Sequence, residues 1–172
     1  MNKIRVGYFV TKDSPYKQVA TDYLVKSLQK FPVKYLCTET DNFGSWQRNV
    51  AEKPSAILHQ LNKLEKDECL VFLDADAEIK QWPVLFEEIP EDYDIALHYL
   101  NWNDWYGYQN NPPTMELLTG TMFFRNNDKV KKLCEHWYEE AKNSNSWEQA
   151  TLSEILPYHS EIKVYELPLS YI

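Results

Sequence analysis

Residues Cys69–Leu73 form an uninterrupted apolar run between Glu68 and Asp74. A short strand that is apolar at every position has no face suited to water, so other elements must cover both sides of its sheet. This pattern is typical of parallel sheets covered by helices. The run therefore constrains the fold strongly.

The residues before this run alternate between strand and helix patterns. Residues 4–10 and 33–37 are rich in β-branched and aromatic side chains and are expected to form strands. Apolar residues recur at helical spacing within residues 15–31 and again after Pro54. Together with the apolar run, these segments form a βαβαβ unit, which predicts an α/β fold with a mostly parallel central sheet flanked by helices.

The remaining segments are less regular, and polar stretches at residues 38–49 and 101–113 indicate loops. We expect a short helix at 84–88, strands at 95–99, 121–125 and 162–167, and helices at 128–142 and 147–156. Neither an internal repeat nor a linker-like stretch interrupts the chain. One domain over residues 1–172 is the simplest organisation.

Charge and cysteine content narrow the class of protein. The net charge of -8 argues against nucleic acid as a partner. The apolar stretch near the N-terminus is short and contains Arg5, so it predicts neither a signal peptide nor a membrane span. Cys37, Cys69 and Cys134 form an odd, widely spaced set, which favours reduced thiols. We therefore expect a soluble, cytoplasmic protein, either a monomer or an oligomer.

Two carboxylates, Asp74 and Asp76, follow the buried run directly. Residues two apart in extended backbone project to the same side, so both can face one ligand, while the small Ala75 points away and lets a ligand approach. Open α/β sheets bind ligands at the carboxyl ends of their strands. Adjacent oxygen donors suit Mn²⁺ or Mg²⁺. A solvated turn is the alternative reading of this Asp-x-Asp pattern.

Other segments accompany the aspartate pair in a fixed order: Gly44–Asn49, Lys53–Ile57, Val71–Ile79, Pro83–Phe86, Leu118–Asn126 and Trp147–Leu152. Together they resemble the metal-dependent nucleotide-sugar glycosyltransferases of the GT-A fold, over nearly the whole chain. The resemblance implies transfer of a sugar from a nucleoside-diphosphate sugar, of UDP or GDP type, to an acceptor that the sequence does not identify. It also implies a nucleotide-binding half, residues 1–80, and an acceptor-side half, residues 81–172.

The resemblance assigns the donor side of the site. Asp74 would lie near the ribose and the metal, and Asp76 would bind the metal that bridges the diphosphate. The segment after the first strand, Thr11 with Tyr8 nearby, would contact the nucleobase, and Ala75 would line the nucleotide-sugar site. Lys53 would approach the phosphates; alternatively it is a solvated residue ahead of Pro54.

The resemblance also assigns residues around the sugar and the acceptor. Thr119 and Gly120 would border the sugar and the acceptor. Gly120 would allow close backbone approach or adopt a positive φ. Alternatively, the segment is a plain turn into a strand. Glu148 and Gln149 are the catalytic candidates, with Trp147 beside them. Glu148 is alternatively a favourable acid in the first turn of a helix.

The aromatic residues of the segment 101–113 offer an acceptor platform. Exposed aromatic side chains on a long loop often bind a ligand. They can instead fold under the loop as a small core of their own. The residues concerned are Trp102, Trp105, Tyr106 and Tyr108.

Relatives of this kind often supply a third metal ligand, frequently a histidine, after a last strand. The chain ends at Ile172, near that position, and His159 is the nearest histidine in order; no third ligand is assigned. This departure leaves open a catalytically incomplete binding or assembly module of the same fold. A phosphatase of the haloacid-dehalogenase type is the other alternative, although Ala77 and Glu78 follow the pair where Gly-Thr is expected.

Overall fold

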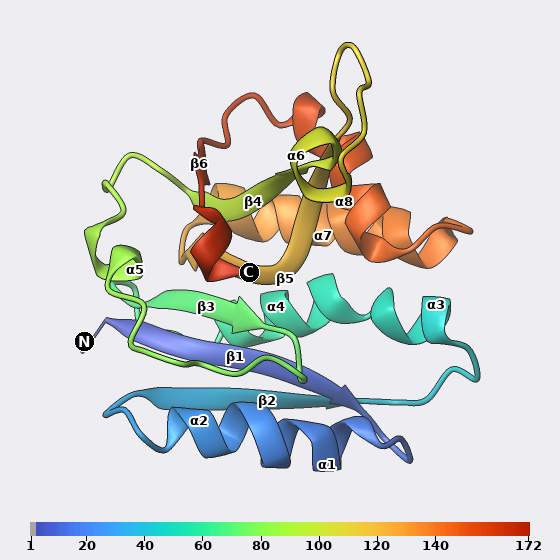
Figure 1. Cartoon of the computed structure of the whole chain (residues 1–172). Helices are drawn as coiled ribbons and strands as arrows, with labels where there is room; N and C mark the ends of the chain where they lie inside the picture. Colours follow the sequence, from blue (N-terminus) through green and yellow to red (C-terminus); the bar gives the residue numbers. More distant parts are fainter. Residues whose placement is uncertain (1–2) are drawn as a thin grey trace.

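The computed structural model describes residues 3–172. Within this range the chain forms a six-stranded sheet with the order β2-β1-β3-β5-β4-β6 (Figure 1). The strands are β1 (Ile4–Thr11), β2 (Lys34–Thr40), β3 (Cys69–Leu73), β4 (Ile95–Asn101), β5 (Met115–Arg125) and β6 (Val164–Glu166). β3 lies in the interior of the sheet, which agrees with its apolar sequence.

The strand directions confirm a mostly parallel sheet. β1 pairs in parallel with β2 and β3, and β4 pairs in parallel with β6. Of the described strands, only β5 runs the other way, antiparallel to β3 and β4. The carboxyl ends of β1 and β3 therefore meet at one edge of the sheet.

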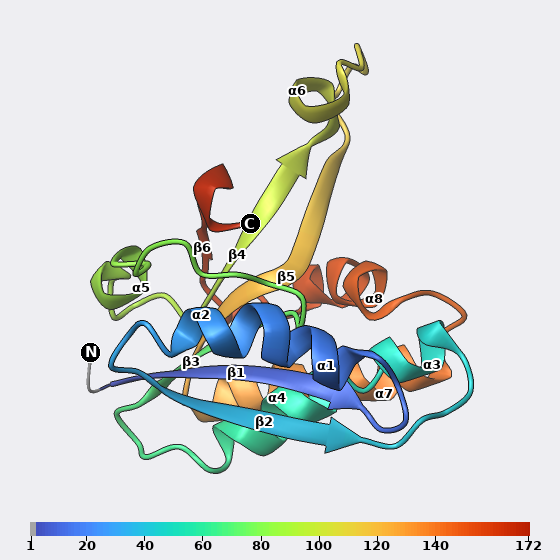
Figure 2. The same ribbon diagram turned by 60° about the horizontal axis from the view of Figure 1, so that its bottom comes forward.

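Helices cover both faces of the sheet (Figure 2). One face is covered by a helical segment made of α1 (Tyr16–Ala20), the π-helical turn η1 (Thr21–Val25) and α2 (Lys26–Leu28). The other face is covered by α4 (Lys53–Leu61), α7 (Asp128–Asn143) and α8 (Glu148–Ile155). Shorter elements are α3 (Trp46–Val50), α5 (Leu85–Glu88), α6 (Trp102–Tyr106), η2 (Leu156–Tyr158) and η3 (Leu169–Tyr171).

The residues of β3 alternate between two cores. Leu70 and Phe72 pack with Trp137 in the core beneath α4 and α7, whereas Val71 packs with Leu24 in the core beneath α1 and α2. Each of these side chains is at most 1% exposed. Burying a side chain such as Phe72 contributes about 1.5–3 kcal/mol. The two-sided burial that the sequence of β3 requires is thus met by helices on both faces.

Two segments expected to be loops contain short helices. The serine Oγ of Ser45 accepts from the Arg48 backbone N–H and so begins α3, and β2 extends to Thr40 instead of ending at residue 37. Asn101 caps α6 in the same way, and Gly107, with φ of 72°, ends it. Local capping therefore overrides the polar composition of both segments.

The expected strand at 121–125 is longer than its sequence indicates. β5 begins at Met115 because it pairs with β4 as far as Asn101. Thr119 and Gly120 consequently lie inside a strand, and the alternative reading of this segment as a plain turn into a strand is wrong. The expected last strand is shorter than predicted, since β6 spans only Val164–Glu166.

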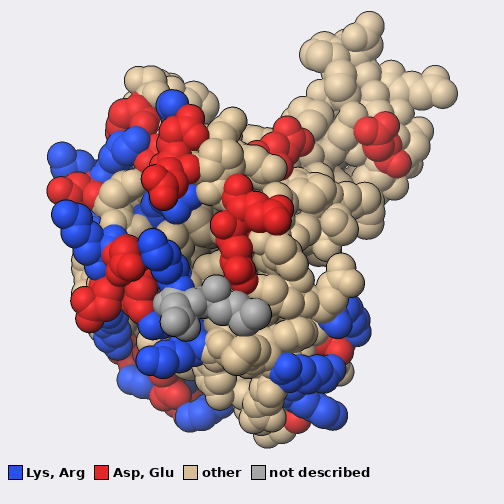
Figure 3. Space-filling view, turned by 90° about the vertical axis from the view of Figure 1, so that its left-hand side faces the viewer, with Lys and Arg blue, Asp and Glu red and all other residues tan. Residues whose placement is uncertain are grey.

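The outer ends of β4 and β5 extend from the body of the molecule and carry α6 at their tip (Figures 1 and 2). We call this hairpin, residues 99–116, the arm. Its charged residues are Asp104 and Glu116. Figure 3 shows that charged side chains gather over the body, while the protruding arm is mostly uncharged on that face.

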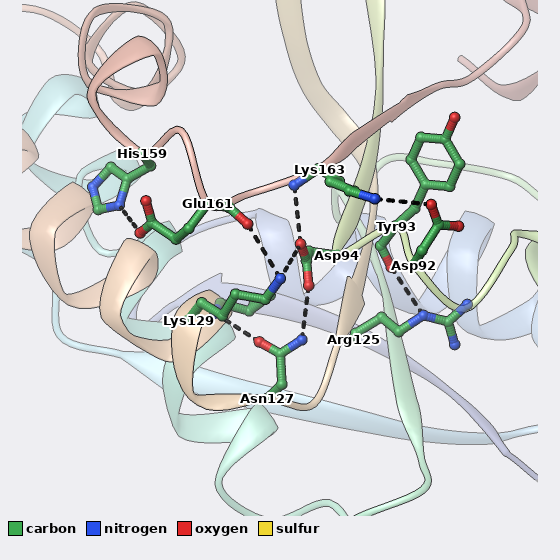
Figure 4. A network of polar contacts seen from close by, with 10 residues as sticks. Asp92, Tyr93, Asp94, Arg125, Asn127, Lys129, His159, Glu161 and Lys163 are labelled. Carbon is green, nitrogen blue, oxygen red and sulfur yellow. Dashed lines mark hydrogen bonds and ion pairs between the residues drawn. The ribbon is translucent and has the colours of Figure 1, made fainter.

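A network of polar contacts holds the base of β4 to α7 and to the segment before β6 (Figure 4). The buried Asp94 accepts from Asn127 Nδ2 at 3.0 Å, from Lys129 Nζ at 2.7 Å and from the backbone N–H of Lys163 at 2.9 Å. Burial opposes ionisation, but Lys129 and the two other donors outweigh it and lower the pKa of Asp94. This anchor lies at the opposite end of β4 from the arm.

None of the helices within residues 3–172 is both long enough and apolar enough to cross a lipid bilayer.

Candidate functional site

A cavity of about 350 Å³ opens at the carboxyl ends of β1 and β3. It is lined by residues of β1, α1, α3, α4, β5 and α8, and by the turn after β3. Most of the residues singled out from the sequence meet here: Thr11, Lys53, Asp74, Ala75, Asp76, Thr119, Trp147, Glu148 and Gln149. The topology thus brings the donor-side and sugar-side candidates into one space.

Asp74 and Asp76 reach the cavity through a turn. The backbone N–H of Ala77 donates to the carbonyl of Asp74 at 3.0 Å, so the chain turns immediately after β3. The expectation of extended backbone, with Ala75 facing away, is therefore wrong. Ala75 also lines the cavity, and its small side chain leaves room beside the two carboxylates.

Lys53, the first residue of α4, lies at the centre of the site. Its Nζ is 2.9 Å from Asp74 Oδ1 and 2.7 Å from Glu148 Oε1. It also donates to Thr119, at 3.2 Å to Oγ1 and 3.4 Å to the carbonyl. Lys53 is only 4% exposed. The alternative reading of Lys53 as a solvated helix residue is wrong.

The charge state of Lys53 follows from its two carboxylate partners. Burial disfavours an ammonium, but the charges of Asp74 and Glu148 outweigh burial, so the pKa of Lys53 is raised above its ordinary value. Lys53 is therefore a buried cation at neutral pH. It joins the turn after β3 to the start of α8.

The start of α8 is held by contacts on both sides. Trp137 of α7 donates from Nε1 to the carbonyl of Glu148 at 2.7 Å. Thr119 donates from Oγ1 to Glu148 Oε1 at 3.0 Å and from its backbone N–H to Gln149 Oε1 at 3.1 Å. Glu148 is 4% exposed. The two residues after the N-cap Trp147 are thus fixed in orientation by β5 and α7.

Glu116 extends this hydrogen-bonded chain into the arm. Its Oε1 accepts from Gln149 Nε2 at 2.8 Å, and its Oε2 accepts from Trp102 Nε1 at 2.8 Å. Glu116 lines the cavity together with Gln149. A carboxylate on β5 therefore connects the aromatic arm with the start of α8.

Gly120 does not line the cavity but approaches Asp74 closely. The Asp74 backbone N–H donates to the Gly120 carbonyl at 2.9 Å. A methyl group added at Gly120 would lie 3.4 Å from Asp74 Oδ2. Such a methyl group would contact the carboxylate without a clash, and glycine leaves that side of Asp74 open.

Several cavity residues were not identified from the sequence. Trp46 and Trp147 meet edge to face at the rim, with ring centroids 6.1 Å apart, and are 48% and 46% exposed. Tyr16 and Asn49 also line the cavity. The signal for Trp46 in the sequence was a tryptophan within the mostly polar segment 38–49. Glu116 gave no such signal, because only the pairing of β4 with β5 places it near Gln149.

Besides Gly120, Tyr8 and the aromatic residues of the arm that were singled out from the sequence lie outside the cavity. Tyr8 is 7% exposed, and burial together with the neighbouring Cys37 raises its pKa. Trp105 is 54% exposed in the arm. Trp102 is partly buried and packs edge to face against Tyr106 and Tyr108. The aromatic residues of the arm therefore combine a small packed cluster with exposed rings.

The carboxylates suit a hard divalent cation. Asp76 is exposed and forms no hydrogen bond or ion pair with any described residue, and Asp74 Oδ2 faces Gly120. Within residues 3–172 no group of three or more His, Cys, Asp or Glu side chains is arranged to hold a metal. His159 instead shares a hydrogen bond with His136 at 2.9 Å. The residues present can supply two oxygen ligands, and phosphate or water oxygens would complete the shell.

Comparison with solved structures identifies the fold. A glycosyltransferase involved in glycosylation of the major capsid of PBCV-1 superposes with a TM-score of 0.68 and 12% identity, covering 95% of this chain and 81% of that one. The galactosyltransferase LgtC, solved in complex with donor and acceptor sugar analogs, superposes with a TM-score of 0.54 and 10% identity, covering 93% and 72%. No curated protein sequence matches the chain.

The sequence itself carries the family assignment. A profile of the nucleotide-diphospho-sugar transferases matches residues 46–172, from α3 to the end of the chain. This range is well over half of the chain and includes Lys53, the aspartate pair, β5 and the start of α8. The chain therefore belongs to the nucleotide-diphospho-sugar transferase family.

Proposed function

We propose that this protein is a divalent-metal-dependent glycosyltransferase that uses a nucleoside-diphosphate sugar of UDP or GDP type. The observation that carries the proposal is the convergence of Lys53, Asp74, Asp76 and Glu148 in one cavity at the carboxyl ends of β1 and β3, in a chain of the transferase family. In the reaction, an acceptor hydroxyl oxygen bonds to the anomeric carbon of the sugar. The bond from that carbon to the diphosphate breaks with its electron pair, and the hydroxyl proton is released to solvent.

The lining of the cavity suggests where the parts of the donor lie. The nucleobase and ribose occupy the side formed by Thr11 and the aromatic rings of Tyr16 and Trp46, because bases stack on aromatic side chains. Tyr8 supports this side from within the core. The diphosphate lies at Asp74 and Asp76, and the sugar extends toward Thr119 and the start of α8.

Asp74 and Asp76 would hold Mn²⁺ or Mg²⁺. Such a cation, when bound, would neutralise the charge that develops on the departing diphosphate. Asp76 is free to bind without losing a partner, whereas Asp74 also contacts Lys53. Lys53 offsets part of the negative charge of Asp74 and Glu148, so it reduces their repulsion of the anionic donor.

Glu148 and Gln149 are the proposed catalytic residues at the sugar. The pairing of Glu148 with Lys53 and Thr119 fixes its carboxylate at the cavity wall. Gln149 has its amide oriented by Thr119 on one side and Glu116 on the other. Both side chains are therefore preorganised to contact sugar hydroxyls or the reacting carbon, which is the property that catalytic groups need.

The assignment of halves remains part of the proposal. Residues 1–80 supply the nucleotide side, and residues 81–172 supply the acceptor side with the arm, Trp102 and Trp105. We also propose a cytoplasmic location, because Cys37, Cys69 and Cys134 are free thiols. Membership of the transferase family favours glycosyl transfer over the phosphatase alternative.

Calorimetric titration with UDP and GDP, each with and without Mn²⁺, tests the donor site directly. We expect one nucleotide to bind, with an affinity at least tenfold higher in the presence of the metal. Hydrolysis of a panel of sugars linked to that nucleotide would then identify the donor. If the folded protein binds neither nucleotide under any condition, the enzyme proposal fails and the binding-module alternative is favoured.

A further inference from the structure

A second cavity, of about 330 Å³, lies on the other side of Gln149, between the base of the arm and α8. It shares Glu116, Trp147 and Gln149 with the first cavity, so the two spaces adjoin. Its other lining residues are Trp102, Thr114, Met115, Leu117, Ala150, Ser153 and Glu154. None of the first cavity's donor-side residues takes part in it.

The lining of this second cavity has a definite chemical character. Trp102 and Trp147 offer apolar ring surfaces, and Thr114, Ser153 and Gln149 offer hydroxyl and amide groups. Two carboxylates, Glu116 and Glu154, complete the polar part, and no Lys, Arg or His is among its described lining residues. Aromatic rings with acidic and amide acceptors suit the C–H faces and hydroxyl groups of a sugar. The same surface repels phosphate, sulfate and carboxylate groups, because it has no cation to pair with them.

We propose that the second cavity binds the acceptor, and that the part of the acceptor held there is an uncharged sugar. The inference rests on the proposed function for its catalytic meaning, but the binding site is defined by this cavity alone. A cavity of about 330 Å³ is near the lower end of the roughly 300–1,000 Å³ range of small-molecule sites, which suits one or two sugar rings.

Glu116 gives the proposal its connection with the reaction. One of its oxygens accepts from Trp102 in the second cavity, and the other accepts from Gln149 at the wall between the cavities. A sugar hydroxyl held beside Glu116 and Gln149 therefore lies at the boundary with the donor cavity. The arm, which carries no Lys, Arg or His and exposes Trp105 and Tyr108, continues this surface outward for a longer glycan.

A glycan array that pairs neutral glycans with their sialylated or sulfated counterparts tests the inference. We expect the wild-type protein to bind neutral members and to bind their charged counterparts at least tenfold more weakly. Ala150 lines the second cavity and not the first, so Ala150→Trp should obstruct the second cavity and weaken binding to neutral glycans at least tenfold. Ala150→Ser is the matched control and should bind as the wild type does. If Ala150→Trp does not fold, Ser153→Phe blocks the same cavity from an exposed position.

Calorimetry with UDP and GDP on the same variants separates this inference from the proposed function. Nucleotide affinity should stay within threefold in Ala150→Trp. Loss of glycan binding with no nucleotide binding in any variant would support the glycan site while rejecting the transferase proposal. The inference is overturned if no neutral glycan binds, if charged glycans bind as tightly as neutral ones, or if the blocked variants bind glycans normally.

Discussion

Lys53 and Glu148 form a buried ion pair, 2.7 Å from Nζ to Oε1, between the first turn of α4 and the first turn of α8. The same ammonium reaches Asp74 at 2.9 Å. Removing two charges from water costs several kcal/mol per ion, so such a pair adds little net stability. Its structural effect is to fix the start of α8 relative to the turn after β3, and these are the two segments that carry the candidate catalytic and metal-binding residues.

Replacing Lys53 by methionine should destabilise the fold by about 3–5 kcal/mol, because it leaves the buried Glu148 carboxylate without its cation. Urea unfolding at neutral pH measures the change. Lys12→Met is the matched control, since Lys12 pairs with Asp41 at the surface and its loss should leave the free energy of unfolding nearly unchanged. The double variant Lys53→Met with Glu148→Gln should recover part of the loss. A cost near that of the control would show that the pair does not hold the site together.

Asp76→Asn should leave stability nearly unchanged and weaken donor binding. Asp76 is exposed and forms no hydrogen bond or ion pair with a described residue, so the expected change in the free energy of unfolding is within about 0.5 kcal/mol. The loss of one anionic ligand should lower the affinity for nucleoside diphosphate with Mn²⁺ at least tenfold, and should leave the metal-free affinity unaffected. Glu78→Gln changes a nearby exposed carboxylate outside the first cavity and should bind normally. Equal affinities in the two variants would remove the metal role of Asp76.

The sequence predicted the central elements because their signals were local. The apolar run of β3 required cover on both faces, and the helical spacing of α4 and α7 matched their buried stripes. The aspartate pair was placed correctly at the strand end, although the route through a turn was missed. Turn formation there depends on one backbone hydrogen bond from Ala77, which composition does not reveal.

The contacts of the site depend on pairings between distant segments. Nothing within the segment around Lys53 shows that it is buried, since its partners come from β3, β5 and α8. Glu116 contacts Gln149 only because β5 extends to Met115 along β4. Polar composition suggested loops in two segments, but N-caps at Ser45 and Asn101 begin the short helices α3 and α6 there.

The Cys134 thiol predicts how stability changes at alkaline pH. Burial raises the pKa of this thiol, so the folded state keeps its proton where the unfolded state loses it. A raised folded-state pKa gives stability that is complete below the unfolded pKa of about 9 and is lost as pH rises above it. One such group contributes a slope of about -1.4 kcal/mol per pH unit in that range.

Above pH 9 the unfolding free energy of Cys134→Ala should therefore fall less steeply with pH than that of the wild type, by up to about 1.4 kcal/mol per pH unit. At pH 7 the variant should be less stable than the wild type, because a buried sulfur is removed. Urea unfolding in the presence of a reductant, at intervals from pH 7 to 10.5, measures both quantities. Leu133→Ala is the control, because it truncates a neighbouring buried side chain that has no titratable group, and its curve should run parallel to that of the wild type. Parallel curves for Cys134→Ala and the wild type would contradict the assignment.

Glu116→Gln should reduce the rate of sugar transfer more than it reduces donor binding. In the wild type the two carboxylate oxygens accept from Gln149 Nε2 and Trp102 Nε1. A glutamine amide presents only one acceptor oxygen, so one donor must face another donor. Gln149 cannot resolve the conflict by flipping, because its nitrogen would then face the backbone N–H of Thr119.

For Glu116→Gln we expect kcat for transfer to fall at least tenfold, with the donor KM within twofold. The free energy of unfolding should fall by about 1–3 kcal/mol. Glu88→Gln changes an exposed carboxylate outside both cavities and should keep the wild-type kcat for transfer. A Glu116→Gln enzyme with unchanged kcat would show that Gln149 needs no positioning from the arm.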